Sequence, residues 1–340
     1  MFKLNTIVRP NILELQPYSS ARDEFTGYDG IFLDANENPF GNLNRYPDPL
    51  QKELKEKIAN VKSISTQNIF VGNGSDEAID MCFRIFCKLG IDKVITFNPT
   101  YGMYEVCSTI NNIEMINIPL TTDFQIDIEK TLTTITDKAI KLLFVCSPNN
   151  PTGNCIEGIK TILENFKGIV VIDEAYADFT DSSWIEKLNQ YPNLIVLQTL
   201  SKAWGLAAAR VGLAFASAEI IALFNKVKPP YNISRLNYEA AISKLDDIDS
   251  YEKQKALIIA ERQNLAKVLD SIPYVTKVYP SEANFILIKV SNADIIYDAL
   301  VKQNIIIRNR NKAIHNCLRI SIGTPIENKK LIIALQNITL

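Results

Sequence analysis

A lysine follows a short apolar stretch at a point where its amine could do covalent chemistry. Lys202 lies in the segment Thr199-Leu-Ser-Lys-Ala-Trp-Gly205, directly after the apolar residues 194–197, and Arg210 follows eight positions later. The amine could bond to an aldehyde, while Ser201 and Arg210 could bind a phosphate through hydrogen bonds and charge. These three side chains predict a site for a cofactor that carries both an aldehyde and a phosphate.

Two further segments end apolar stretches with polar groups that suit such a cofactor. Asp173 and Tyr176 follow the apolar residues 169–172. Asn150 lies in the proline-flanked segment Ser147-Pro-Asn-Asn-Pro-Thr-Gly153. Because open α/β sheets bind ligands at the carboxyl ends of their strands, these groups should meet. Asp173 could keep a pyridine ring protonated, and Tyr176 and Asn150 could hydrogen-bond its phenolic oxygen. Pyridoxal phosphate has this combination of groups.

A glycine-containing segment, Val71-Gly-Asn-Gly-Ser-Asp-Glu77, joins a predicted strand to a predicted helix. The free N–H groups at Gly74, Ser75 and Asp76 could receive the cofactor phosphate. The alternative is an ordinary helix N-terminus with Ser75 as its N-cap, and the two can hold together. A dinucleotide-binding fingerprint is disfavoured, because Glu77 stands where its third glycine belongs.

Residues 147–153, 173–176 and 201–210 resemble the three signature segments of the fold-type I pyridoxal-phosphate aminotransferases, in the same order and spacing. Within that family the chain is similar to the histidinol-phosphate aminotransferases along nearly its entire length. The segments that carry this closer similarity are Tyr18 to Arg22, Asp34 to Pro39, Asn44 to Asp48, Pro99 to Tyr104 and Cys317 to Ser321. The chain departs from the family at Trp204, where Phe is usual, and at Ala208-Ala209, where Gly-Leu is usual.

The resemblance implies pyridoxal 5′-phosphate as the cofactor and Lys202, Asp173 and Tyr176 as the catalytic residues. It also implies that Tyr101 stacks on the cofactor ring, although an aromatic side chain in such a loop is more often part of a core. Tyr46 would reach the cofactor phosphate of the other subunit in a homodimer. The implied cofactor contacts are Lys202, Gly74, Ser75, Asp76, Tyr101, Asn150, Asp173, Tyr176, Ser201, Arg210 and, from the other subunit, Tyr46.

Arginines near the carboxyl terminus could bind an anionic substrate. Arg319 lies within the apolar residues 318–322, where a guanidinium needs an anionic partner, whereas Arg310 is expected to lie in solvent. By resemblance, the substrate's anionic end would be bound by Arg308 and Arg319 together with Tyr18, Asn36 and, nearby, Asn232. An arginine pair suits a phosphate as well as a carboxylate.

The implied reaction transfers an amino group between L-histidinol phosphate and 2-oxoglutarate, giving imidazole-acetol phosphate and glutamate with ping-pong kinetics. The nearest alternatives are an aromatic amino acid aminotransferase and a phosphothreonine decarboxylase of the same branch. A ligand-sensing regulator with this fold would need a helix-turn-helix domain, for which the roughly 35 residues before Asn36 are too few. A nicotinamide dehydrogenase would leave the three signature segments without a role.

The composition of the 340-residue chain is that of an ordinary globular protein. Its 36 basic and 38 acidic residues nearly balance, so we do not expect nucleic acid or a membrane surface as a partner. No apolar segment approaches the ~18 residues of a membrane helix, and residues 1–17 do not resemble a signal peptide, which predicts the cytoplasm. Six cysteines without Cys-x-x-Cys spacing predict reduced core thiols, and the single histidine, His315, gives no basis for a metal site.

Apolar stretches alternate with amphipathic ones in the middle of the chain, which predicts a mostly parallel sheet between helices. The expected strands there are residues 69–72, 93–97, 141–146, 169–172, 194–197 and 211–216, with a helix over 76–87. We predict an α/β large cofactor-binding domain at 36–232 and a smaller α+β domain at 233–340. The latter should hold a long helical stretch to about Leu269 and strands near 284–290, 305–308 and 318–322. Residues 1–35 are predicted to form an N-terminal arm and part of the small domain, packing there or on a partner.

Overall fold

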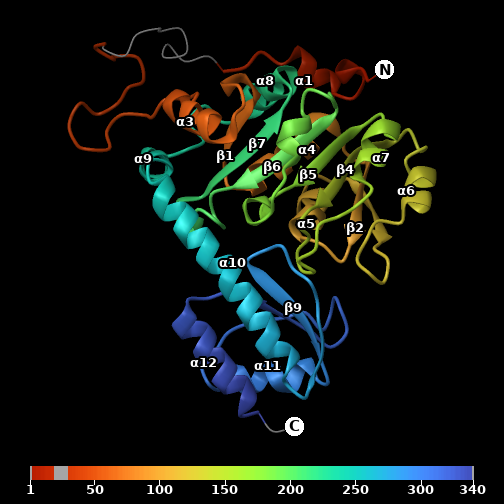
Figure 1. Cartoon of the computed structure of the whole chain (residues 1–340). Helices are drawn as coiled ribbons and strands as arrows, with labels where there is room; N and C mark the ends of the chain where they lie inside the picture. The colour runs from red at the N-terminus through yellow and green to blue at the C-terminus, as the bar shows by residue number, and fades with distance from the viewer. Residues whose placement is uncertain (1, 19–29, 339–340) are drawn as a thin grey trace.

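The structure, a computed structural model, describes residues 2–18 and 30–338. Its strands form two sheets: a seven-stranded sheet from residues 69–216 and a four-stranded sheet from residues 275–321. Figure 1 shows the larger sheet with its helices at one end of the molecule and the smaller sheet at the other. The predicted domain boundary at 232/233 lies between the two sheets and remains a prediction.

The large sheet is mostly parallel, as predicted. Its strands are β1 (Ile69–Asn73), β2 (Lys93–Asn98), β3 (Glu114–Pro119), β4 (Ile140–Cys146), β5 (Ile169–Asp173), β6 (Leu194–Thr199) and β7 (Val211–Ala216), in the order β1-β7-β6-β5-β4-β2-β3. Only β7 runs antiparallel to its neighbours. The edge strand β3 was not predicted, because its half-exposed polar residues interrupt the apolar pattern.

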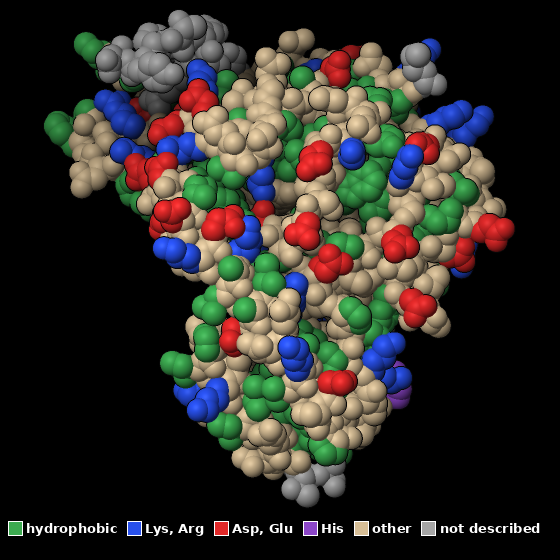
Figure 2. Space-filling model, in the orientation of Figure 1, with side chains coloured by type: hydrophobic (Ala, Val, Ile, Leu, Met, Phe, Trp, Pro, Cys, Tyr) green, Lys and Arg blue, Asp and Glu red, His purple; other side chains and the backbone are tan. Residues whose placement is uncertain are grey.

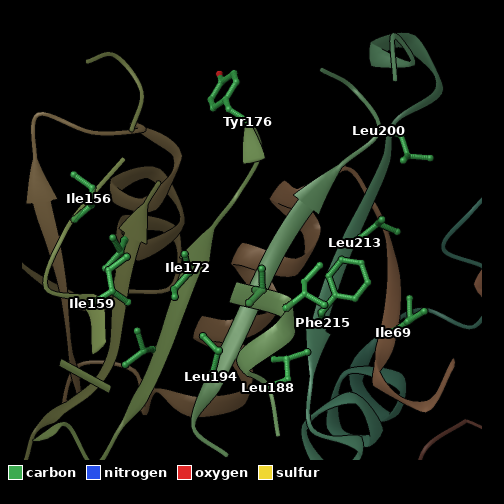
Figure 3. Close-up of a cluster of buried hydrophobic side chains, with 14 of the residues drawn as sticks. Ile69, Ile156, Ile159, Ile172, Tyr176, Leu188, Leu194, Leu200, Leu213 and Phe215 are labelled. Atoms are coloured by element: carbon green, nitrogen blue, oxygen red, sulfur yellow. The ribbon is translucent and has the colours of Figure 1, made fainter. Parts of the chain in front are cut away.

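Both faces of the large sheet are buried by helices. On β5, Val170 and Ile172 belong to one apolar cluster, while Ile169 and Val171 belong to the cluster on the opposite face. Figure 3 shows part of the first cluster, with Ile172 on β5, Leu194 on β6 and Phe215 on β7. The covering helices are α3 (Lys52–Lys62), α4 (Ser75–Phe86), α5 (Met103–Ile110), α6 (Ile128–Thr134), α7 (Ile159–Asn165), α8 (Ala218–Val227) and α9 (Arg235–Leu245). Alternation of side chains along buried strands therefore produces two cores.

The N-terminal arm packs on the large sheet's helices. Val8 and Ile12, the latter on α1 (Pro10–Glu14), belong to the cluster around α4 and α8, and the Arg9 N–H donates to the Ile85 carbonyl at 3.0 Å. The expectation that the arm forms part of the small domain is therefore not met by residues 2–14. The short apolar segment packs against these helices, and sequence periodicity does not reveal this contact.

The small sheet has the order β10-β11-β9-β8 and is antiparallel throughout. Its strands are β8 (Val275–Val278), β9 (Phe285–Val290), β10 (Arg308–Asn309) and β11 (Cys317–Ser321), and its helices are α10 (Ile248–Asp270), α11 (Ala293–Val301) and α12 (Pro325–Gln336). The single helical stretch that we expected is two helices, because the Asp247 side chain caps α10 at the Ser250 N–H. Figure 1 shows α10 running from one sheet to the other.

The surface carries both signs of charge interspersed over the face shown in Figure 2, in line with the balanced composition. Among the described residues, no helix has both the length and the apolar character needed to cross a membrane. Five of the six cysteines are buried and Cys155 is partly exposed, as expected for core thiols.

Candidate active site

A cavity of about 630 Å³ is lined by the carboxyl ends of the large-sheet strands and by the β10–β11 hairpin. It brings together most of the residues singled out from the sequence: Gly74, Ser75, Asp76, Tyr101, Asn150, Asp173, Tyr176, Ser201, Lys202, Arg210, Arg308 and Arg319. These residues are spread over nearly 250 positions of the chain, and the parallel strands gather them at one edge.

Lys202 lies in a tight turn directly after β6. The turn closes through the Gly205 N–H, which donates to the Lys202 carbonyl at 3.1 Å, and Gly205 has the positive φ that the turn requires. The buried Trp204 ring stacks on Tyr251 of α10, with the ring centroids 3.7 Å apart. Trp204 stands where the family usually has Phe, and its larger ring anchors the turn. Burial, followed by the charge of Arg319, lowers the pKa of Lys202. A neutral amine is therefore easier to reach than on a surface lysine.

Asp173, the last residue of β5, is only 2% exposed. The Tyr104 hydroxyl donates to its Oδ2 at 2.7 Å, and the Ala175 N–H donates to its Oδ1 at 3.1 Å. Burial raises the pKa of Asp173 to about 6, although the hydrogen bonds from Tyr104 and Ala175 lower it. A cation placed against this carboxylate would favour its charged form, as a protonated pyridine nitrogen does. Tyr104 belongs to a segment that carries the family resemblance, but no sequence signal links it to Asp173.

The start of α4 forms a cradle for an anion. Gly74 is the N-cap, with φ of 76°, and no side chain caps the helix, so the alternative of Ser75 as N-cap is wrong. The Gly74 N–H donates to the Arg210 carbonyl at 2.9 Å, and a Cβ at Gly74 would lie 2.6 Å from Arg210 Nη2. A Cβ at Gly212 would lie 2.0 Å from the Ser75 nitrogen. The two glycines therefore let β7 and Arg210 lie against the uncapped helix N-terminus.

Neighbouring side chains hold this cradle in place. Arg210 Nη2 lies 3.5 Å from Asp76 Oδ2, and the Tyr101 hydroxyl donates to Asp76 Oδ1 at 3.0 Å. The Ser201 hydroxyl lies 3.0 Å from the Thr199 hydroxyl. A helix N-terminus, a hydroxyl and a guanidinium suit a phosphate, while the buried Asp173 suits a ring cation. The residues present therefore fit pyridoxal phosphate.

Arginines of the small sheet complete the cavity wall. Arg308 lies opposite Arg319 in the β10–β11 register, and Arg319 Nη1 donates to Asn150 Oδ1. The Arg319 guanidinium and Tyr176 both pack on the Phe285 ring, at 5.1 Å in each case. Arg310 also lines the cavity and is only partly exposed, so the expectation that it lies in solvent is wrong. Hairpin register, which the sequence does not give, turns its side chain inward.

Four predicted residues do not line this cavity in the single subunit described. Tyr18 is 72% exposed, and the rest of its segment, residues 19–22, lies outside the described residues. Asn36 and Tyr46 line a second cavity of about 490 Å³, where Tyr46 stacks on Tyr231 at 4.4 Å. The Asn232 amide donates to the Val71 carbonyl and to Glu77 Oε2, each at 3.0 Å. In one subunit, Asn232 thus fixes the loop beside β1.

Comparison with known proteins gives consistent results. The model of the family "Aminotransferase class I and II" matches residues 31–335. The histidinol-phosphate aminotransferase of Parabacteroides distasonis is 50% identical, with 100% of each chain covered. That of Christiangramia forsetii is 52% identical over 99% of this chain and 98% of the relative. The solved structure of histidinol-phosphate aminotransferase from Sinorhizobium meliloti in complex with pyridoxal-5′-phosphate has a TM-score of 0.79 at 25% identity, covering 89% of this chain and 88% of that one.

Proposed function

The chain belongs to the class I and II aminotransferase family, and from this we propose that it transfers the amino group of L-histidinol phosphate to 2-oxoglutarate in histidine biosynthesis. It is an aminotransferase with the fold-type I architecture, and pyridoxal 5′-phosphate is its cofactor. The observation that carries the proposed substrate is the presence of small-sheet arginines in the same cavity as Lys202. Guanidinium groups bind both the phosphate of one substrate and the carboxylates of the other.

The proposed roles of the residues follow from their environments. The cofactor, when bound, supplies an electron sink for the substrate carbon that loses a proton. Gly74, Ser75, Ser201 and Arg210 bind its phosphate, and the Asp173 carboxylate holds its ring nitrogen protonated. Tyr104 fixes the orientation of Asp173 through the 2.7 Å hydrogen bond.

Lys202 is the proposed proton carrier. Acting as a base, its Nζ takes the proton from the substrate carbon. Acting as an acid, it then delivers this proton to the cofactor carbon. The lowered pKa favours the neutral amine that the first step needs, and Asp173 and Asp76, which raise the pKa, keep the protonated form accessible for the second. Tyr176 and Asn150 orient the ring through its phenolic oxygen, while the hydrogen bond from Arg319 fixes the Asn150 amide.

A single-turnover experiment tests the substrate. Without 2-oxoglutarate, the holoenzyme should release about one imidazole-acetol phosphate per active site from L-histidinol phosphate, because the amino group stays on the enzyme. Later addition of 2-oxoglutarate should yield one glutamate. Faster reaction with phenylalanine, or release of carbon dioxide from phosphothreonine, would instead support one of the two alternative activities.

The active unit is proposed to be a homodimer in the cytoplasm, where buried free thiols stay reduced. Four large apolar side chains in the segment before Tyr46 are strongly exposed in the single subunit: Ile31, Leu33, Phe40 and Leu43, at 92%, 87%, 81% and 59%. Their exposure favours a protein partner, and a second copy would cover them. Tyr46 would then complete the phosphate site of the neighbouring subunit, with Asn36 and Tyr18 near that subunit's substrate.

Subunit mixing tests the role of Tyr46. Tyr46→Ala and Lys202→Ala should each be inactive alone, because one lacks a phosphate contact and the other lacks the catalytic amine. When equal amounts exchange subunits, half of the dimers are mixed and each mixed dimer has one intact site. Activity should therefore recover to about a quarter of the unmodified enzyme. If a tag shows exchange but no activity returns, Tyr46 does not act across the interface.

A further inference from the structure

Three arginines converge on the cavity from one face of one hairpin. Arg308 pairs with Arg319 across β10 and β11, and the Arg310 N–H continues the ladder by donating to the Cys317 carbonyl at 2.9 Å. Side chains two positions apart on a strand lie on the same face, so Arg310 projects to the side of Arg308 and Arg319. All three line the cavity that holds Lys202.

This cluster has no carboxylate partner in the part of the chain that the structure describes. Among residues 2–18 and 30–338, no Asp or Glu forms an ion pair with Arg308, Arg310 or Arg319. Other arginines do pair with carboxylates: Arg45 with Glu37, Arg84 with Asp80, Arg210 with Asp76 and Arg235 with Glu239. Three neighbouring guanidinium groups without a carboxylate repel one another, which costs stability unless an anion joins them.

Arg310 is partly buried, yet its side chain lacks hydrogen-bond partners in the described chain. Its Nε is buried and has no hydrogen-bond partner in the described chain, and its side chain donates no hydrogen bond there. Burial, followed by the charges of Arg319 and Arg308, lowers the pKa of Arg310, and no acidic group counteracts these effects. Arg319 Nε is likewise buried without a partner in the described residues, but Arg319 Nη1 already donates to Asn150. Arg310 thus has donors to offer.

We propose that Arg310 is a specificity-determining residue that, with Arg308 and Arg319, binds the phosphate of the amino-donor substrate. The inference rests on the proposed function. A phosphate monoester carries a charge of about −1.5 to −2 at pH 7 and three acceptor oxygens, whereas a carboxylate carries one charge and two oxygens. Three guanidinium groups lining one cavity offer enough charge and donors for the phosphate, while two suffice for a carboxylate.

The test compares substrates with and without the phosphate on the holoenzyme. For Arg310→Gln, kcat/KM for L-histidinol phosphate should fall by about 10- to 100-fold, the range expected for lost charge-assisted hydrogen bonds, with kcat changed less than about threefold. The values for L-histidinol, which lacks the phosphate, and for glutamate should change less than about threefold. Arg310→Lys should have a kcat/KM for L-histidinol phosphate between those of the wild type and Arg310→Gln, because lysine keeps the charge but cannot donate two parallel hydrogen bonds. Arg84→Gln, which removes an equal charge from an exposed position of α4, is the matched control and should behave as wild type.

Other outcomes overturn the proposal. If kcat/KM for L-histidinol falls equally, Arg310 acts on the reaction steps that both substrates share or on the fold. If kcat/KM for glutamate falls more, Arg310 binds a carboxylate instead. Unchanged kinetics would give it no role. Calorimetric titration of the holoenzymes with inorganic phosphate should show about tenfold weaker binding in Arg310→Gln, and equal binding would refute the inference. If the wild type does not prefer L-histidinol phosphate to L-histidinol, the proposed function fails, while the phosphate titration still decides the role of Arg310.

Discussion

Lys202→Ala is expected to lower kcat by at least about 10⁴-fold while leaving the protein folded, because one amine both bonds the cofactor and carries the proton. The fold should tolerate the change. Lys202 forms no ion pair within the described residues, and its lowered pKa indicates that burial and Arg319 disfavour its charge. The melting temperature of the cofactor-free variant should therefore not fall below that of the wild type.

The covalent role of Lys202 is tested separately from its role in turnover. Borohydride reduction of the wild-type holoenzyme, followed by peptide mapping, should find the pyridoxyl group on Lys202. Lys160→Ala is a suitable control, since Lys160 is exposed on α7 and, among the described residues, forms an ion pair only with Glu164. A label on another lysine, or turnover by Lys202→Ala at more than a few per cent of the wild-type rate, would refute the assignment.

Asp173→Asn should have the second-largest effect on catalysis, lowering kcat by roughly 10³-fold with a smaller change in cofactor affinity. The amide cannot compensate a ring cation, so the electron sink is weakened in the transition state. Its hydrogen bonds can be kept, because the amide oxygen can accept from the Ala175 N–H and the amide nitrogen can donate to the Tyr104 hydroxyl. The fold should therefore be retained.

The same substitution should stabilise the cofactor-free protein near neutral pH. The folded state raises the pKa of Asp173 from 3.8 to about 6 and so binds its proton more tightly than the unfolded chain. This contribution to stability is fully present below about pH 4 and is lost as the pH rises through 6. Across this window, the free energy of unfolding of Asp173→Asn should rise relative to that of the wild type by about 3 kcal/mol in total. At higher pH this difference should stay constant.

Denaturant unfolding of the cofactor-free proteins between pH 4 and 8 measures this difference. Asp123→Asn, at an exposed position in a turn, is the control and should show no such pH-dependent gain. Near-wild-type kcat in Asp173→Asn would make Asp173 a structural residue. A stability difference that does not vary with pH would mean that burial does not raise the pKa of the Asp173 carboxyl group.

The sequence alone predicted most of the residues that line the cavity around Lys202 and most strands of the large sheet. Buried strands are nearly continuous apolar runs, and polar groups that directly follow such runs, as at Asp173, Asn150 and Lys202, are brought to one edge by parallel pairing. The family resemblance added the identity of the cofactor. These features depend on local patterns and on a general rule of α/β folds, so they can be read without coordinates.

Other features were decided only by the tertiary structure. The hydrogen bond from Tyr104 to Asp173, the inward position of Arg310 and the packing of the N-terminal arm on α4 all join segments whose spacing in the sequence carries no signal. A shift of one residue in hairpin register would turn Arg310 to the opposite face, and hydropathy does not fix that register for alternating polar residues. Contacts between distant elements depend on where whole helices and strands pack, and this is the physical reason why they appear only in the folded chain.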